Sequence, residues 1–301
     1  MNSKIIQGCM RIGGLSVEEL KHLIDVQIEH GVNFFDLADI YGNKYGVGRC
    51  EELFGEVLKA YPELRSKIII QTKCGIIKGA LPMYDSSKEH ILAAANLSLK
   101  RLQTTYLDYL LIHRPDPLMD PKEVADAFDQ LYAEKKVLHF GVSNFNPSQI
   151  ELLKKYCHQP IEVNQIQMSV MFTGVLDSGI LANTKNDGAA DRDGFIVNYC
   201  MLNNIQLQCW SPLQYGFFEG VFVGNEKFPL LNEVLNKTAE KYKVTPTAVA
   251  IAWLLKHPTN MQVVVGSVNL DHLIEMDAAL NFTLTRNEWY AIYEAAGNIL
   301  P

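Results

Sequence analysis

A regular alternation of short apolar segments with amphipathic segments runs along this 301-residue chain and limits the folds open to it. The apolar segments are nearly continuous, as parallel strands covered on both faces should be. The segments between them have the i, i+3, i+4 apolar spacing of helices. We predict eight strands, at Ile5–Cys9, Asn33–Asp36, Ile68–Lys73, Leu107–His113, Phe140–Ser143, Glu162–Gln165, Gln206–Trp210 and Gln262–Val265.

Residues that favour helix starts stand in front of the amphipathic segments. A serine or threonine followed three residues later by glutamate has the spacing of a capping box. An asparagine or threonine directly before proline places a capping residue ahead of a first-turn proline. These pairs are Ser16 with Glu19, Ser86 with Glu89, Asn146 with Pro147, Thr245 with Pro246, and Thr285 with Glu288.

Eight strands that alternate with helices predict an α/β fold, a (β/α)8 TIM barrel of parallel strands with helices outside. The alternative is an open doubly wound sheet, which usually carries a GxGxxG turn after its first strand. Here the sequence from Gly8 to Gly13 lacks that pattern. No linker or repeat divides the chain, so we expect residues 1–301 to form one domain. Residues 168–193 and 213–229 exceed ordinary connections and are expected to be long loops whose role stays open.

Composition argues against several kinds of partner. The net charge of −7 disfavours binding to a nucleic-acid backbone. The longest apolar runs are far too short to span a membrane. Met1–Lys4 has no apolar signal core, and the six cysteines form no CxxC pair. We therefore expect a reduced, cytoplasmic protein without a disulfide framework.

Four ionisable side chains stand at the ends of neighbouring predicted strands. Asp36, Lys73 and His113 end the second, third and fourth strands, and Tyr41 follows five residues after Asp36. Each has an ordinary explanation on its own: a helix cap, a lysine reaching out to solvent, a core histidine and a loop aromatic. Together at the carboxyl end of a barrel they form a cluster that is costly to bury unpaired, which makes it a candidate active site.

These residue types suit proton transfer. A buried lysine beside a phenol stabilises the phenolate, so we expect Lys73 to lower the pKa of Tyr41. Asp36 balances and orients the ammonium group, and His113 adds a directional hydrogen bond. The chain has no set of His and carboxylate residues with clear metal-ligand spacing, so no metal site is predicted. A proton donor of this kind needs a hydride donor as its complement.

The remaining strand ends offer groups that fit a nicotinamide nucleotide. Amide and hydroxyl side chains suit the carboxamide, a tryptophan suits a flat ring, and backbone N–H groups suit phosphate oxygens. The first are Ser143, Asn144 and Gln165, the second is Trp210, and the third come from Ser211–Leu213, Gly266 and Ser267.

The order of these motifs resembles the aldo-keto reductase family over roughly residues 5–296. The most specific block is Gly31-Val32-Asn33-Phe34-Phe35-Asp36-x-Ala38-x-x-Tyr41-Gly42. The others are Lys73 after Ile69-Ile70-Gln71-Thr72, Leu110-Leu111-Ile112-His113-Arg114-Pro115-Asp116, Gly141-Val142-Ser143-Asn144-Phe145, Asn164-Gln165, Trp210-Ser211-Pro212-Leu213 and Gly266-Ser267.

The resemblance implies an enzyme that reduces an aldehyde or ketone to an alcohol on a (β/α)8 barrel, with extended NADP(H), or NAD(H), as cofactor. It implies the catalytic tetrad Asp36, Tyr41, Lys73 and His113, with Tyr41 as general acid. The cofactor contacts that it implies are Met10, Arg11, Asp36, Ser143, Asn144, Gln165, Trp210, Ser211, Pro212, Leu213, Gly216, Gly266, Ser267, His272 and Glu275.

Three departures from the family pattern bear on these expectations. The hairpin that precedes the first strand in the family is nearly absent, because only four residues precede Ile5. Gly266 and His272 stand where many members carry cations for the 2′-phosphate, so we expect a preference for NADPH below about tenfold. Of the pair that usually holds adenine, Glu275 is present and Met276 replaces asparagine.

The substrate is expected to be a small carbonyl compound that the sequence does not name. The stretch 162–178 and the short loop after His113 resemble bacterial members of unassigned substrate. Scattered aromatic residues most often serve simple packing, and the alternative is that four phenylalanines form an apolar wall beside the substrate: Phe172, Phe217, Phe218 and Phe222. The acidic stretch Asp187–Asp193 does not have the spacing of an EF-hand and is expected to be solvated.

Two other functions stay open at this point. One is a cofactor-binding regulatory subunit like the β-subunits of voltage-gated potassium channels, which the lack of a long segment before Ile5 disfavours. The other is a barrel enzyme of different chemistry, such as a phosphosugar isomerase, which the presence of Tyr41 and Lys73 disfavours. The sequence does not indicate the oligomeric state.

Overall fold

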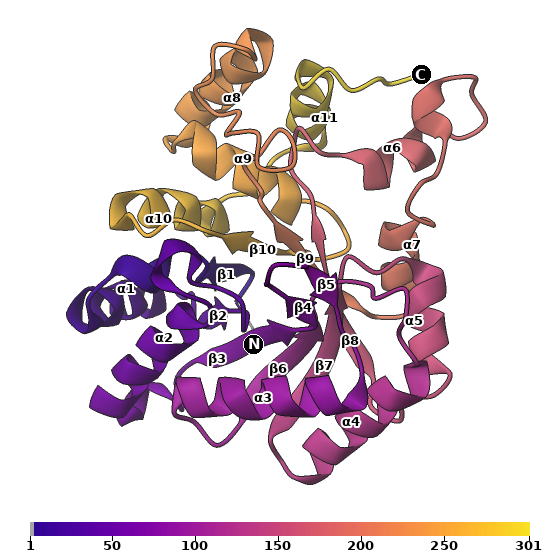
Figure 1. The fold of residues 1–301 in the computed structure, drawn as a ribbon. Coiled ribbons are helices and arrows are strands. Elements are labelled where there is room, and N and C mark those ends of the chain that lie inside the picture. Colours follow the sequence, from indigo (N-terminus) through magenta and orange to yellow (C-terminus); the bar gives the residue numbers. More distant parts are fainter. Residues whose placement is uncertain (1–2) are drawn as a thin grey trace.

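The computed structural model describes residues 3–301, and for residue 43 only the backbone. Met1 and Asn2, part of the predicted segment before the first strand, lie outside the described residues. Eight parallel strands close into a barrel in the order β1-β10-β9-β8-β7-β6-β3-β2, with helices around it (Figure 1). The predicted (β/α)8 barrel is therefore confirmed.

Every predicted strand is present, with ends that differ by a few residues. Their observed bounds are β1 (Ile5–Gly8), β2 (Phe34–Asp36), β3 (Ile69–Cys74), β6 (Leu107–Ile112), β7 (Val137–Ser143), β8 (Ile161–Gln167), β9 (Gln206–Trp210) and β10 (Gln262–Val265). The sequence reading missed a small antiparallel hairpin, β4 (Ile76–Ile77) with β5 (Met83–Tyr84). Two-residue strands are too short to leave a periodic pattern.

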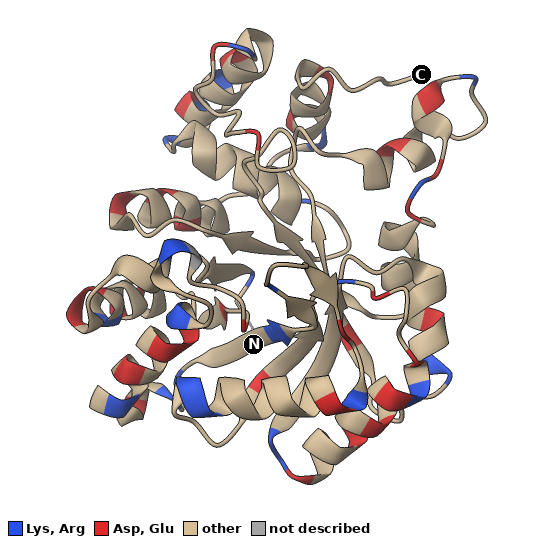
Figure 2. Ribbon diagram, viewed as in Figure 1, with Lys and Arg blue, Asp and Glu red and all other residues tan. Residues whose placement is uncertain are grey.

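The helices cover the outside of the barrel. Their bounds are α1 (Val17–Glu29), α2 (Arg49–Ala60), α3 (Lys88–Leu102), α4 (Pro121–Ala133), α5 (Pro147–Lys154), α6 (Gly174–Ile180), α7 (Ile196–Leu202), α8 (Pro229–Tyr242), α9 (Pro246–Leu255), α10 (Leu270–Asp277) and α11 (Arg286–Ala295). Figure 2 shows that charged residues of both signs lie mainly on these helices, whereas the strands are mostly uncharged. None of the helices among the described residues is long and apolar enough to cross a membrane.

Four of the five predicted helix starts are confirmed. Ser16 and Thr285 form full capping boxes, Asn146 caps α5 and Thr245 caps α9. The fifth was wrong by one residue, because the Ser87 hydroxyl accepts the hydrogen bond from the N–H of His90.

Ser86, which was predicted as that cap, is buried, and its N–H donates to Asp116 in the loop after β6. Adjacent serines give the same local signal, and the tertiary contact decides between them.

The long segment 168–193 is not a plain loop, contrary to the prediction. It contains α6 and a short 3-10 turn at Asp187–Ala189. The main apolar core lies between the strands and the surrounding helices, as in the stacked pair Phe128 and Phe140. A second cluster is made by side chains of alternating positions on the barrel strands: Ile6, Phe34, Tyr109, Leu111, Val163 and Val264.

Candidate active site

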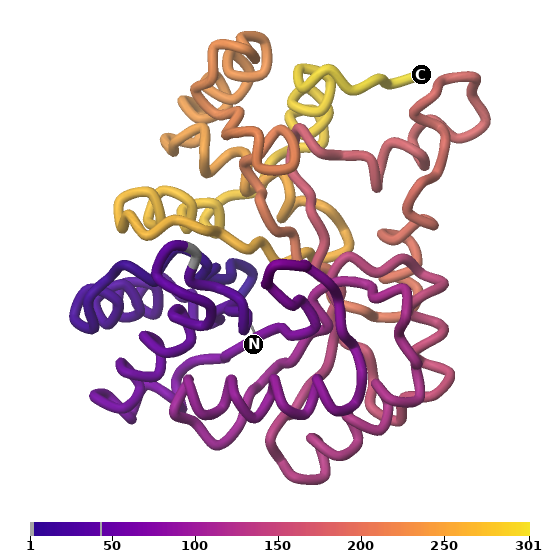
Figure 3. Tube along the Cα trace, in the orientation of Figure 1, coloured from indigo at the N-terminus to yellow at the C-terminus, as the bar shows by residue number. Residues whose placement is uncertain are grey.

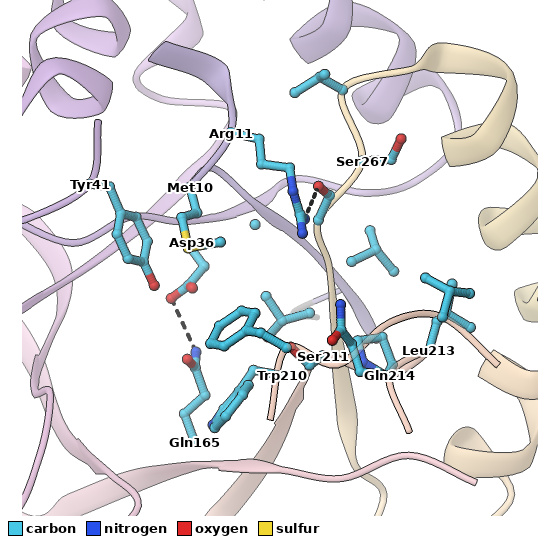
Figure 4. Close-up of a pocket in the computed structure, with 18 of the residues that line it drawn as sticks. Met10, Arg11, Asp36, Tyr41, Gln165, Trp210, Ser211, Leu213, Gln214 and Ser267 are labelled. Atoms are coloured by element: carbon cyan, nitrogen blue, oxygen red, sulfur yellow. Dashed lines mark hydrogen bonds between the residues drawn. The ribbon is translucent and has the colours of Figure 1, made fainter. Parts of the chain in front are cut away.

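A cavity of about 690 Å³ opens at the carboxyl ends of the barrel strands (Figure 4). Sixteen of the predicted site residues line it: Met10, Arg11, Asp36, Tyr41, His113, Ser143, Asn144, Gln165, Trp210, Ser211, Pro212, Leu213, Gly266, Ser267, His272 and Glu275. Two do not. Lys73 lies beneath the cavity, and Gly216 lies outside its lining, where its carbonyl accepts a hydrogen bond from Gln167.

An ion pair between Lys73 and Asp36 forms the floor of this site. Lys73 Nζ lies 2.7 Å from Asp36 Oδ2 and also donates to the Leu37 carbonyl oxygen. Both side chains are buried, so the pair is screened little by solvent. Burial by itself lowers the pKa of Lys73, but Asp36 and Tyr41 outweigh that effect and the pKa is raised. Lys73 is therefore a permanent cation at physiological pH.

Tyr41 stands directly above this cation. Its hydroxyl oxygen lies 3.4 Å from Lys73 Nζ, and the ammonium group lies 5.1 Å from the centre of the tyrosine ring. Lys73 acts to lower the pKa of Tyr41, as predicted, but the predicted net lowering was wrong. Burial raises the pKa of Tyr41, and the opposing effect of Lys73 is smaller. The phenol is therefore fully protonated at neutral pH.

His113 borders Tyr41 on the other side. The two rings meet edge to face, with 5.9 Å between their centres. Burial lowers the pKa of His113 well below its usual range, and the cations Lys73, Arg114 and Lys78 add to that effect. His113 Nδ1 is buried and has no hydrogen-bond partner in the described part of the chain. The neutral ring as a whole lines the cavity.

Three glutamines inside the barrel hold Asp36 in place. Gln71 and Gln165 donate to Asp36 Oδ1 over 2.6 and 3.1 Å, and both also donate to Gln208 Oε1. Sequence reasoning missed Gln71 and Gln208. The signal was present, since an amide within an apolar strand must find buried partners. The network fixes the carboxylate so that Oδ2 faces Lys73.

The predicted carboxamide and ring contacts come together at the ends of β7, β8 and β9. Asn144 donates to the Ser143 hydroxyl and accepts from Trp210 Nε1 over 3.2 Å. The Gln165 amide nitrogen is already bonded to Asp36 and Gln208, which leaves its carbonyl oxygen as the group available to a ligand. Phe218 stacks on Trp210 with 6.2 Å between ring centres.

The far end of the cavity carries a cation that the sequence reading placed beside the pyrophosphate. Arg11 Nη1 donates to the Gly266 carbonyl oxygen over 2.7 Å (Figure 4). A first side-chain carbon at Gly266 would lie 2.7 Å from the same nitrogen. Arg11 therefore occupies the place of the side chain that Gly266 lacks. His272 and Glu275, on α10, line the same end.

The predicted phenylalanine wall is only partly present. Phe218 lines the cavity, and Phe217 packs edge to face on Trp210. Phe222 belongs to the buried core, with no exposed surface, so the packing interpretation holds for it and the wall does not include it. Phe172 is not among the lining residues. An isolated aromatic residue in a sequence gives no sign of whether it faces a core or a cavity.

Sequence reasoning also missed two cations at the Tyr41 end of the cavity. Arg114 and Lys78 line the cavity near His113 and Tyr41. Arg114 directly follows His113 and was quoted with it, so its place at a strand end was a usable signal. Lys78 follows the unpredicted strand β4, and nothing in the sequence pattern marks it.

Comparisons with known proteins agree on one family. Residues 4–296 match the model of the "Aldo/keto reductase family". The oxidoreductase YcsN of Bacillus subtilis, named as uncharacterized, is 36% identical over 97% of this chain and 94% of that protein. A 6-dehydroglucose reductase of Agrobacterium fabrum is 35% identical over 98% and 94%. The crystal structure of the thermostable aldo-keto reductase Tm1743 has the same fold, with a TM-score of 0.75 at 24% identity over 97% of this chain and 95% of that one.

Proposed function

Because this chain belongs to the aldo/keto reductase family, we propose that it reduces an aldehyde or ketone to an alcohol with a nicotinamide cofactor. The family and its relatives support carbonyl reduction by an oxidoreductase. One observation carries the finer proposal. A protonated phenol, Tyr41, stands over a buried Lys73–Asp36 ion pair and beside a neutral histidine at the wall of one cavity.

In the proposed mechanism Tyr41 is the general acid. Its raised pKa keeps the proton on the phenol until the carbonyl oxygen gains negative charge. Lys73 then stabilises the phenolate that forms, 3.4 Å away, and Asp36 keeps the ammonium group in position. His113, being neutral, offers a hydrogen bond to the carbonyl oxygen without competing as an acid. The cofactor, when bound, supplies the hydride.

The residues present fit such a cofactor. The cavity volume lies within the range of ligand and cofactor sites. Ser143, Asn144 and the carbonyl oxygen of Gln165 would hold the carboxamide, and Trp210 would pack on the nicotinamide ring. Residues 211–213 and Ser267 would hold the phosphates, with Arg11 beside them. NADP(H) and NAD(H) both remain in the proposal.

The identity of the relatives narrows the alternatives. An oxidoreductase and a reductase are 36% and 35% identical over nearly the full chain, so the regulatory-subunit alternative is not favoured. The name of the second relative adds sugar aldehydes to the candidate substrates. We place the enzyme in the cytoplasm because its six cysteines are free thiols, five of them buried.

The test is the oxidation of NADPH and NADH, followed by absorbance, with a panel of aldehydes, 1,2-diketones and sugar aldehydes. We expect turnover with at least one carbonyl compound. Tyr41→Phe should lower kcat by roughly 100- to 10,000-fold, the range for losing a general acid. Cofactor affinity of that variant should be retained, measured by fluorescence titration. A Tyr41→Phe protein with more than half the wild-type turnover, with chemistry rate-limiting, would exclude Tyr41 as the acid.

A further inference from the structure

Two cations with no acidic partner stand at the Tyr41 end of the cavity. Arg114 and Lys78 both line it, close to Tyr41 and His113. Neither forms an ion pair with a carboxylate of residues 3–301. Arg114 is half-buried and Lys78 is exposed, so the guanidinium group in particular stands at the cavity wall without a charge to balance it. An unpaired cation at a cavity wall is a candidate binding group.

Arg114 is held in place by packing rather than by charge. It follows His113 at the end of β6, is half-buried, and its guanidinium carbon lies 5.8 Å from the centre of the Trp210 ring. Asp116, two residues after Arg114, has other partners. Its two oxygens accept hydrogen bonds from the N–H groups of Leu118 and Ser86. All five donors of the guanidinium group stay free of protein acceptors among the described residues.

Lys78 is exposed and lies on the turn of the β4–β5 hairpin. Its only hydrogen bond within the described chain goes from Nζ to the carbonyl oxygen of Ile40, over 3.3 Å. Ile40 directly precedes Tyr41. The ammonium group therefore lies over the loop that carries Tyr41, with at least two donor hydrogens to spare.

The balance of charge along the cavity differs between its two ends. Two carboxylates occur among its lining residues: Asp36, which is paired with Lys73, and Glu275, which belongs to the far end. Arg114 and Lys78 are therefore uncompensated at the Tyr41 end. The effect reaches His113, whose pKa they help to lower. This positive end belongs to a chain with a net charge of −7, so the positive charge is local to the Tyr41 end of the cavity.

We propose that the carbonyl substrate carries an anionic group, a carboxylate or a phosphate, that binds between Arg114 and Lys78. The planar fork of Arg114 suits bidentate binding of such a group, and Lys78 adds a point charge. Because Arg114 directly follows His113 and Lys78 contacts Ile40, next to Tyr41, one small molecule can present its carbonyl group to Tyr41 and its anionic group to the two cations. This inference rests on the proposed carbonyl reduction.

The test compares matched pairs of aldehydes that differ in charge. 4-Carboxybenzaldehyde is paired with its methyl ester, and glyceraldehyde 3-phosphate with glyceraldehyde, which separates carboxylate from phosphate. For wild type we expect kcat/KM to be at least about tenfold higher for the anionic member, mainly through a lower KM, as fits charge-assisted hydrogen bonds. That advantage should shrink as salt is added.

Variants separate this role from a structural one. Arg114→Gln and Lys78→Gln should each reduce the ratio of kcat/KM between the anionic and neutral members, and the double variant should bring the ratio close to one. Lys237→Gln, on the outer helix α8 away from the cavity, is the matched control and should keep the wild-type ratio. If the Arg114 and Lys78 variants lower kcat/KM equally for the anionic and the neutral aldehyde of a pair, the anion-binding role is wrong.

A binding measurement keeps this inference distinct from the proposed function. Tryptophan fluorescence is titrated with 4-(hydroxymethyl)benzoate and with its methyl ester, in the presence of oxidised cofactor. Selective binding of the anion supports the site even if no aldehyde is turned over, in which case carbonyl reduction itself is wrong. Efficient reduction of the neutral aldehydes, with no preference for the anions in rate or in binding, overturns the inference and leaves the proposed function standing.

Discussion

At the scale of single residues the site depends on two opposite charges that are buried together. Lys73 has no exposed surface, and its one carboxylate partner, Asp36, receives further hydrogen bonds from Gln71 and Gln165. A buried pair of this kind is not strongly stabilising in itself, but removing one partner leaves an unpaired charge. The arrangement is therefore best explained by what the ammonium group does for Tyr41.

Replacing Lys73 tests whether its charge balances Asp36 and whether that charge acts on Tyr41. Lys73→Met should lower the free energy of unfolding by about 3 kcal/mol, because Asp36 is left as a buried, unpaired carboxylate. The raised pKa of Lys73 means that its contribution is complete at pH 7 and is lost only as pH rises through that pKa. Urea unfolding at pH 7 measures the change, and the double variant Asp36→Asn, Lys73→Met should lose less than Lys73→Met alone.

The same variant should change the pH profile of alcohol oxidation, in which the proposed mechanism makes Tyr41 the base. Lys73 opposes the rise that burial causes in the pKa of Tyr41. Without it the rising limb of kcat against pH should move to higher pH. A folded, active Lys73→Met protein with an unchanged limb would show that the charge of Lys73 does not act on Tyr41.

At the scale of elements the important segment is the loop between β2 and α2, which carries Tyr41. Its backbone is anchored at Asp39, whose N–H donates to the Lys73 carbonyl oxygen and whose carbonyl oxygen accepts from Arg101 on α3. Arg101 also pairs with Glu51, on α2. Burial raises the pKa of Asp39 to about 7, and the neighbouring Glu51 carboxylate adds to the rise. The contacts that fix the loop thus bury a carboxyl group whose ionised form is disfavoured.

The raised pKa of Asp39 predicts how stability varies with pH. An acid whose folded pKa is raised binds more protons in the folded than in the unfolded state, so stability falls as pH rises from about 4 to 7. Asp39→Asn removes that loss and should raise the free energy of unfolding at pH 8 by about 2–4 kcal/mol. It should also flatten the pH dependence measured by urea unfolding.

Asp126→Asn, at an exposed aspartate on α4, is the matched control and should change neither quantity appreciably. A destabilised Asp39→Asn protein with the wild-type pH dependence would mean that Asp39 is ionised and usefully paired in the folded state.

The elements also show how much of the structure can be predicted from the sequence. The eight barrel strands and four helix starts follow from local patterns, since apolar runs and capping pairs act within a few residues. The N-cap at Ser87, the helix α6 and the core position of Phe222 depend on contacts between distant segments. The sign of the pKa shift of Tyr41 was missed for the same reason. Burial outweighs the lysine, and burial is a property of the folded chain.

At the scale of the whole molecule, barrel closure sets the end of the cavity that carries Arg11. Strand β1 pairs with β10, and Gln7 lies opposite Val265, so the first and last strands meet at one seam (Figures 1 and 3). Arg11 follows β1, and Gly266 follows β10 directly. The guanidinium group of Arg11 can therefore fill the place of a side chain 255 residues away in sequence.

This geometry changes the expected cofactor choice. A preference for NADPH below about tenfold follows from Gly266 and His272 taken alone. Arg11 restores a cation at that end of the cavity, and we expect it to bind the 2′-phosphate. Arg11→Met should then weaken the binding of NADPH by about tenfold to a hundredfold, as fits the loss of a hydrogen bond to a charged group. The affinity for NADH should change far less.

Fluorescence titration with both cofactors decides the role of Arg11. Arg11→Lys keeps the charge but not the planar fork, so its selectivity for NADPH should fall between those of wild type and Arg11→Met. His272→Arg adds a second cation at the same end and should increase the preference for NADPH. The pyrophosphate is common to both cofactors, whereas the 2′-phosphate belongs to one. If Arg11→Met weakens the binding of NADPH and of NADH equally, Arg11 therefore contacts the pyrophosphate. The 2′-phosphate would then receive no cation from the segment after the first strand.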